Sequence, residues 1–368
     1  MSALDHTRRD LIKNSLCVIG AGALAGCSVS TSQMLNNQQS IVPPALKKGD
    51  TIGFFSPSTP ATTFAHKRFA RAKDFLALQG FKLKAGSLTG QKDAYRSGTI
   101  AQRANELNEL IRDPSVRCIM STIGGMNSNA LLPYIDYDAL RRDPKIIIGY
   151  SDVTAILFGI YQQTGITTYY GPALVASFGE MGYFLEKTYA YFKQVVEQPT
   201  LPITINNPDY WTQEYVNWET QHSEKPRIEN KLVTINTGKA TGRLIVGNHN
   251  TLSGIFGTKY MPRIEVGDIL LLEDSFQDAA TVERSTAHLK LAGVFERIGG
   301  LIIGKHENYD DKGSNRPCYE TMMEVIGDVD YPILAQYDCA HTHPMITLPL
   351  GANVTLDANK QLLTINYI

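Results

Sequence analysis

The segment Gly149-Tyr150-Ser151-Asp152 places a serine where an expected strand ends and an expected helix begins. A side chain at such a turn is exposed at the carboxyl edge of a parallel sheet, where open α/β sheets bind ligands. The first N–H groups of the following helix are unpaired and can stabilise negative charge beside the serine. Serine and aspartate are also preferred helix caps, and this segment alone favours a cap over a nucleophile.

A serine nucleophile needs a base, and the base needs a group that orients it. His341 and His343 lie in residues 338–344 (DCAHTHP), a loop expected after a buried strand. Glu273 closes the apolar run Leu270–Leu272, so a strand delivers it to a sheet edge. A buried glutamate at such a position rarely lacks a partner. Hydroxyl, imidazole and carboxylate are therefore all available for nucleophilic catalysis.

Two consecutive glycines, Gly124 and Gly125, follow another expected strand. Glycine lets the backbone approach a ligand closely. The N–H groups of this pair, together with the N–H of Asp152, could stabilise an oxyanion. A plain tight turn is the alternative, because a pair of glycines is weak evidence by itself.

Alternating strands and helices in the first half predict a parallel sheet that positions these residues. The expected strands are residues 51–56, 116–122 and 145–149, and the expected helices are residues 62–80, 99–112 and 153–161. The second half is richer in strands, with one clear helix at 279–291. Its expected strands are residues 242–247, 268–272, 300–304, 332–337, 352–356 and 361–365. The predicted class is α/β: an N-terminal parallel, Rossmann-like sheet with flanking helices, and a C-terminal β-rich α/β domain.

The N-terminus resembles an export signal. Residues 7–13 (TRRDLIK) carry the paired arginines, apolar pair and lysine of a twin-arginine signal. The apolar stretch 16–26 is too short to span a bilayer. It ends in LAGC, similar to a bacterial lipobox, in which Cys27 would be lipidated. We expect an exported protein, lipid-anchored at the periplasmic side of the cell envelope, or a cytoplasmic one if the signal is not used. An ordinary amphipathic helix is the alternative.

Composition limits the other classes. Lys and Arg number 35 and Asp and Glu 36, a net charge of −1, which leaves no basic footprint for a nucleic acid polymer. The five cysteines form no CxxC pair, so neither a disulfide framework nor a cysteine zinc site is indicated. The expected organisation is a signal (1–27), a disordered tether (28–46), an N-terminal domain (47–199), an aromatic-rich excursion (200–240) and a C-terminal domain (241–368).

Several motifs together resemble the LD-carboxypeptidase family of serine peptidases, most closely its microcin C immunity peptidase branch. The resemblance runs from about Lys47 to the C-terminus. Its motifs, in order, are Gly124-Gly125, Gly149-Tyr150-Ser151-Asp152, Tyr170-Gly171-Pro172-Ala173, Leu272-Glu273-Asp274 and Ala340-His341-Thr342.

The resemblance implies a triad in which Ser151 is the nucleophile, His341 the general base and Glu273 the orienting carboxylate. Gly125 and Asp152 would supply oxyanion N–H groups. It implies no metal and no organic cofactor, and a possible homodimer. The expected reaction is cleavage of an amide next to a free carboxylate, such as the L,D bond of a murein tetrapeptide. An aminoacyl-nucleotide amide, the target of the branch, is the alternative.

Aromatic residues gather in the excursion, at Tyr210, Trp211, Tyr215 and Trp218. In the microcin-type enzymes a loop in this stretch stacks on a nucleobase, and stacking contributes about 1–3 kcal/mol per base. The candidate substrate-binding residues are Gly124, Asn127, Trp211 and Trp218. Packing of the rings against the body, or a dimer interface, is the alternative.

Two other functions compete with the peptidase. Asp338, His341 and His343 form a D-x-x-H-x-H cluster that could bind zinc, although no second ligand cluster is evident. A lipoprotein that binds cell-wall peptides without cleaving them is the second. The presence of Ser151, Glu273 and His341 argues against it.

Overall fold

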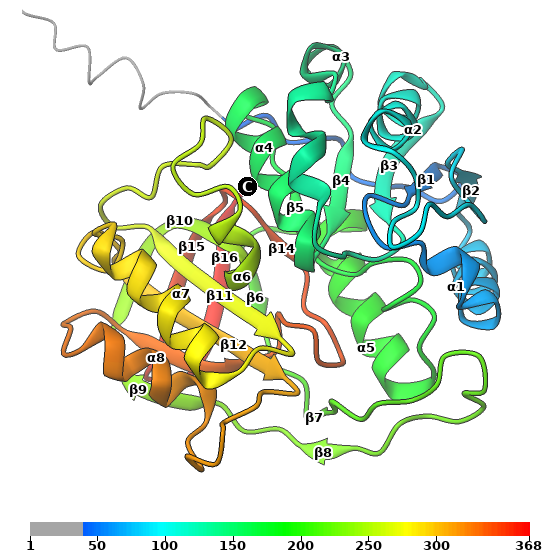
Figure 1. The fold of residues 1–368 in the computed structure, drawn as a ribbon. Coiled ribbons are helices and arrows are strands. Elements are labelled where there is room, and N and C mark those ends of the chain that lie inside the picture. The colour runs from blue at the N-terminus through cyan, green and yellow to red at the C-terminus, as the bar shows by residue number, and fades with distance from the viewer. Residues whose placement is uncertain (1–39) are drawn as a thin grey trace, which may run out of the picture. The chain divides into compact units, whose positions relative to one another are not determined.

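The computed structural model describes residues 40–368, built around two sheets (Figure 1). The first sheet has six strands in the order β14-β5-β4-β3-β1-β2. All its pairings are parallel except that of β14 with β5. The strands are β1 Thr51–Phe55, β2 Lys82–Ala85, β3 Val116–Ser121, β4 Ile146–Gly149, β5 Tyr169–Tyr170 and β14 Leu348–Pro349.

Helices flank this first sheet (Figure 1). They are α1 His66–Leu78, α2 Ile100–Arg112, α3 Tyr137–Arg142, α4 Thr154–Thr164 and α5 Gly182–Phe192. The start of α2 is fixed by a capping box in which the Thr99 and Gln102 side chains each accept from the other's backbone N–H. Its apolar positions, Ala104, Leu107 and Ile111, recur at helical spacing and are buried.

The second sheet has eight strands in the order β6-β16-β15-β10-β11-β12-β13-β9. Its centre, β10 to β13, is parallel, and α7 and α8 lie beside each other along it (Figure 1). The strands are β6 Ile203–Ile205, β9 Val233–Asn236, β10 Lys239–Asn248, β11 Ile269–Ser275, β12 Gly300–Glu307, β13 Ile333–Tyr337, β15 Asn353–Asp357 and β16 Leu362–Tyr367. The helices are α6 His249–Ser253, α7 Ala279–Leu291 and α8 Cys318–Ile326.

The two sheets exchange chain segments. Strand β6, which precedes most of the second half, pairs with β16 in the second sheet. Strand β14, from the last part of the chain, pairs with β5 in the first. Because each sheet needs a strand from the other half of the sequence, residues 40–368 form one compact unit.

The predicted α/β class and its parallel strands are confirmed, but several elements were not predicted. These are α3, α5, α6 and α8 and the strands β2, β5 and β14. The excursion contains β6 and β9 as well as the short pair β7 Tyr210–Trp211 and β8 Ile228–Glu229. Part of the expected tether belongs to the body, because Ile41 forms a bridge with Ile166 and Leu46 is buried. The signal and Cys27 lie outside the described residues. From residue 40 onward, no helix combines the length and apolarity that crossing a membrane requires.

Candidate active site

Ser151 occupies the sharp turn between β4 and α4. Its φ of +63° lies in the left-handed region, which is uncommon for a residue with a Cβ and marks backbone strain typical of functional sites. Gly124 lies directly against it, since a Cβ added there would come within 2.7 Å of Ser151 Cβ and 2.9 Å of its Oγ. The glycine at this position is therefore required by the close approach of the serine.

Glu273 and His341 are joined at the end of β11. Oε2 of Glu273 accepts hydrogen bonds from Nδ1 of His341 at 2.6 Å and from its backbone N–H at 3.1 Å. Because a carboxylate can only accept, Nδ1 carries the proton and Nε2 is left as the basic nitrogen. Within residues 40–368, Nε2 has no hydrogen-bond partner.

The charges of this pair support each other. Burial acts to raise the pKa of Glu273, but His341 and the other donors around it hold that pKa below its ordinary value. Burial likewise acts to lower the pKa of His341, and the Glu273 carboxylate raises it above the usual range. The pair therefore favours an ionised acid beside an imidazole that holds a proton strongly once it gains one.

A hydrogen-bond chain connects the pair to the serine turn. The Tyr170 hydroxyl donates to Oε1 of Glu273 and accepts the backbone N–H of Ser151 at 3.1 Å. The amide of Asn248 donates to the same Oε1 at 3.2 Å. The Tyr150 ring packs edge-on against the His341 ring, with centroids 4.8 Å apart. These contacts fix the orientation of Glu273 and His341 relative to the serine turn at the end of β4.

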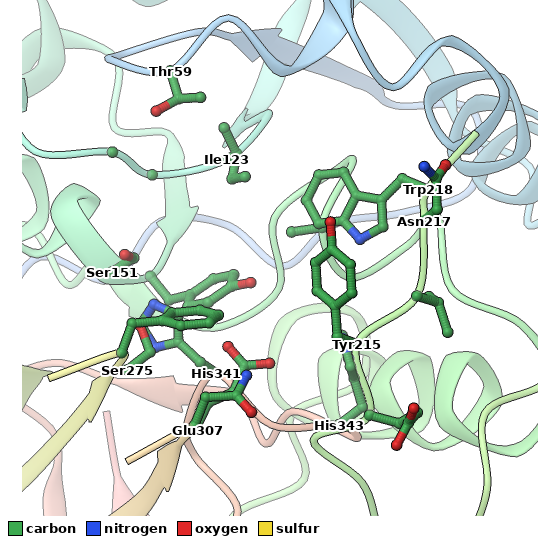
Figure 2. A pocket seen from close by; sticks show the side chains of 18 of the residues that line it. Thr59, Ile123, Ser151, Tyr215, Asn217, Trp218, Ser275, Glu307, His341 and His343 are labelled. Carbon is green, nitrogen blue, oxygen red and sulfur yellow. The ribbon is translucent and has the colours of Figure 1, made fainter. Parts of the chain in front are cut away.

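Ser151 and His341 line one cavity of about 620 Å³ (Figure 2). Figure 2 shows Ser151, Ser275 and His341 at one side of it and Tyr215 and Trp218 at the other. The Ser151 hydroxyl, like Nε2 of His341, has no hydrogen-bond partner in the described part of the chain. Both groups can therefore act on a substrate in this cavity.

The expected oxyanion groups lie next to the serine. Gly125, with φ of +148°, lines the cavity, and a Cβ there would come within 2.1 Å of Ser58 Oγ. The side chain of Asp152 is buried, and its Oδ2 accepts the N–H groups of Asn127 at 3.0 Å and Ser128 at 2.9 Å. This contact holds the glycine loop against the start of α4.

Asn127, expected to contact substrate, has a structural part instead. Its side-chain oxygen accepts from the Ser58 hydroxyl at 2.9 Å and from Arg103 at 2.6 Å. It is not among the residues that line the cavity. The other backbone candidate, Gly124, does line it.

The two tryptophans lie in different places. Trp218 lines the cavity, stacks on Phe64 and has the Arg68 guanidinium 4.8 Å from its ring. Trp211 lines a separate cavity of about 400 Å³, where Nζ of Lys305 lies 5.2 Å from its ring. The expectation of substrate contact therefore fits Trp218 and not Trp211, which packs on a buried ion pair.

The residues of the possible zinc cluster, Asp338, His341 and His343, contact different partners in the structure. Asp338 is fully buried and pairs with Lys305 at 2.8 Å. His343 lies against Glu180, with Nε2 3.6 Å from Oε2. From residue 40 to the C-terminus, no three His, Cys, Asp or Glu side chains are grouped as metal ligands.

Sequence reasoning missed Glu307 and Lys225, which both line the cavity. Glu307 ends the apolar strand β12 as Glu273 nearly ends β11, so the same strand-end signal could have found it. Burial raises the pKa of Glu307. Lys225 lies in the irregular part of the excursion, where no periodic pattern marks it.

Family models for the two LD-carboxypeptidase domains match this chain, the N-terminal domain over residues 52–171 and the C-terminal domain over residues 241–356. The chain belongs to the LD-carboxypeptidase family. It is therefore a serine peptidase, a hydrolase, as the resemblance of its motifs implied.

Its relatives in this family include the microcin C7 self-immunity protein of Escherichia coli, 48% identical over 90% of this chain and 97% of that protein. A Vibrio cholerae protein named putative carboxypeptidase is 58% identical, over 85% of this chain and 94% of its own length. A Bacillus subtilis protein named probable murein peptide carboxypeptidase is 27% identical, over 87% and 92%.

Solved structures of the microcin C7 self-immunity protein share the fold. One, in complex with aspartyl sulfamoyl adenosine, has a TM-score of 0.87 and 48% identity, and the match covers 89% of this chain and 99% of that one. This likeness confirms the predicted LD-carboxypeptidase family and its microcin C immunity branch.

Proposed function

We propose that this enzyme is a serine carboxypeptidase or amidase that uses Ser151, His341 and Glu273 as its triad. Nε2 of His341 removes the Ser151 proton as Oγ attacks the amide carbonyl, and Glu273 stabilises the imidazolium that forms. The imidazolium then gives its proton to the departing amine, which leaves an acyl-serine. A water, activated by the same imidazole, hydrolyses the ester and restores the enzyme.

Backbone N–H groups at Gly125 and Asp152 are the proposed oxyanion donors. The negative oxygen of the tetrahedral intermediate develops next to Oγ. Asp152 follows Ser151 in the chain, and Gly125 follows Gly124, which lies against Ser151. Donors fixed by the backbone need no reorganisation when charge develops. The support for this assignment is the packing of the glycine loop against the serine turn.

The observation that carries the proposal is the hydrogen bond between the buried Glu273 and His341, which lines the same cavity as the strained Ser151. Mass spectrometry of products formed from a murein tetrapeptide tests it. We expect release of the terminal D-residue by the wild type and none above background by Ser151→Ala. Ser275→Ala, which changes another serine lining the same cavity, should keep activity. Full activity of Ser151→Ala would refute the triad.

An aminoacyl-nucleotide amide is the second candidate substrate. Trp218 and Tyr215 offer flat aromatic surfaces in the cavity, and a related protein is solved with aspartyl sulfamoyl adenosine. An aspartyl-adenylate amide and the murein tetrapeptide, offered side by side, distinguish the two. The substrate with the larger kcat/KM is assigned, and cleavage of neither would overturn both assignments.

For location, we propose that residues 1–27 direct export and that Cys27 carries the lipid. The support is the order of the paired arginines, the apolar stretch and the LAGC sequence. Metabolic labelling with a fatty acid should mark the wild type and not Cys27→Ser. Equal labelling, or no labelling of either, would contradict the anchor.

A further inference from the structure

The side chains that line the active-site cavity include several glutamates and the lysine Lys225. Among the described residues, Glu214, Glu219 and Glu307 line it, together with a single lysine, Lys225, and no arginine. A substrate with a free carboxylate, which the proposed function requires, enters a site in which most fixed charges repel it. Lys225 is the one lysine or arginine among the described residues of the cavity wall, and its ammonium group can offset this repulsion.

Lys225 is only partly neutralised by the protein. Its side chain is 5% exposed, and its Nζ lies 3.3 Å from Oε2 of Glu180. The same carboxylate oxygen is already 2.8 Å from a guanidinium nitrogen of Arg68. One carboxylate thus serves two cations, and an ammonium group with three N–H bonds retains capacity for another acceptor. A buried cation normally needs such an acceptor.

His343 adds a second polar group at the same wall. It is 6% exposed, lines the cavity and faces the same Glu180 oxygen at 3.6 Å. Its Nδ1 is buried and has no partner among the described residues. Burial and the neighbouring Lys225 lower the pKa of His343 well below its ordinary value, so the ring is neutral and can donate or accept a hydrogen bond.

The cavity on the other side of the nucleophile lacks a cation. A space of about 330 Å³ shares Ser151 with the main cavity. Neutral residues and two acidic ones, Asp152 and Asp274, line it, and none of the described residues around it is Lys, Arg or His. Burial and then Glu273 raise the pKa of Asp274 to about 7. An anionic substrate group therefore has no pairing partner there.

We propose that Lys225, assisted by His343, binds the anionic group of the substrate portion in the larger cavity. Glu180 is a positioning residue that holds Lys225 at the wall together with Arg68. The inference rests on the proposed amide hydrolysis and specifies its recognition step. The group bound is an anionic oxygen group, either the terminal carboxylate of a peptide or the phosphoryl group of a nucleotide.

A cycle of two substrates and three enzymes tests the proposal. The substrates are a murein tetrapeptide with a free terminal carboxylate and the same peptide ending in a carboxamide. The enzymes are the wild type, Lys225→Met and Lys225→Arg. We expect the wild type to prefer the free acid by at least tenfold in kcat/KM, mainly through KM. Lys225→Met should remove most of this preference, and Lys225→Arg should keep part of it.

A second set of measurements, with a nucleotide, distinguishes a peptide carboxylate from a phosphoryl group as the anion that Lys225 binds. Inhibition of each enzyme by adenosine monophosphate and by adenosine gives the contribution of the phosphoryl group. Loss of the monophosphate preference in Lys225→Met, with the peptide preference intact, assigns Lys225 to phosphate. Loss of the peptide preference alone assigns it to the carboxylate.

The comparison within one variant guards against misfolding, because partial unfolding lowers activity on acid and carboxamide alike. An unchanged preference in both arms overturns the role of Lys225, while Ser151-dependent cleavage by the wild type leaves the proposed function standing. Absence of cleavage by the wild type would overturn the proposed function itself.

Discussion

The catalytic candidates and the aromatic segment that faces them are held in different ways. Ser151 and Glu273 lie at the ends of parallel strands, and the loop after β13 brings His341 to Glu273. Residues 212–225 contain no strand and are attached mainly through side chains. Backbone hydrogen bonds therefore place the groups that react, whereas a few polar contacts place the groups expected to bind.

The attachment of the aromatic segment centres on α1. The side-chain oxygen of Gln221 accepts from Arg68 at 2.7 Å and Arg71 at 3.0 Å, and Glu219 accepts the N–H of Lys67 at 2.9 Å. Deeper, Arg68 pairs with Glu180, and both are fully buried. Since these contacts do not involve the strand ends, substitutions should separate binding from chemistry.

Breaking the catalytic side should have the largest effect. Glu273→Gln removes the charge that stabilises the imidazolium and presents an amide that can favour the wrong His341 tautomer. We expect kcat to fall about 1,000-fold or more, with KM nearly unchanged. Steady-state kinetics on the cleaved substrate measure both. A loss confined to KM would show that Glu273 acts in binding instead.

Breaking the attachment of the aromatic segment should chiefly affect stability and KM. Arg68→Met leaves the buried Glu180 short of its main partner, which should cost about 3–5 kcal/mol in the free energy of unfolding. Urea unfolding measures this cost. Arg71→Met is the matched control, because Arg71 contacts Gln221 and Gly179 but makes no ion pair with Glu180. Equal costs for the two variants would contradict a special role for the buried pair.

Substituting each tryptophan in turn should give smaller effects, and these test whether the aromatic segment binds the substrate. Trp218→Leu removes a ring from the active-site cavity and should raise KM for a nucleotide substrate by roughly tenfold or more, as loss of one stacked base contact implies. Trp211→Leu changes the ring in the other cavity and should leave that KM within about twofold. If both substitutions raise KM alike, the effect reflects the excursion as a whole rather than stacking.

The sequence predicted the catalytic side better than the binding side, for a physical reason. Short apolar runs, such as residues 145–149 with their final glycine, mark where strands end in the sequence. Ser151 and Glu273 could therefore be placed at sheet edges. Their meeting with His341 depends on docking of two sheets, which local pattern does not encode. The prediction that these three residues form one triad came from the resemblance of the motifs to the LD-carboxypeptidase family.

The positions of the Trp211 and Trp218 rings depend on contacts with residues that are distant in sequence. The Trp211 ring packs against Lys305 at another cavity, whereas the Trp218 ring packs against Arg68 and Phe64 at the active-site cavity. Composition alone makes the two tryptophans equivalent. The same limit applies to Lys225, whose role follows from burial beside Glu180 and not from any motif.

The pH dependence of the His341 ring should show the smallest but most specific effect. Burial would lower its pKa, but Glu273 raises it above the ordinary value of about 6.5. The ring must be neutral to act as base, so kcat/KM should fall as pH drops through this raised pKa. Its contribution to folding stability has the opposite sense: it is complete below about pH 6.5 and is lost as pH rises through the folded pKa.

Nuclear magnetic resonance titration of the ring in Ser151→Ala and in Ser151→Ala with Glu273→Gln isolates the cause. Removing the carboxylate should move the His341 midpoint to lower pH. His306, whose pKa burial lowers to about 4, should stay neutral throughout and serves as the internal reference. A midpoint that does not move would mean that the 2.6 Å contact with Glu273 carries little charge interaction, and the triad would then lose its electrostatic basis.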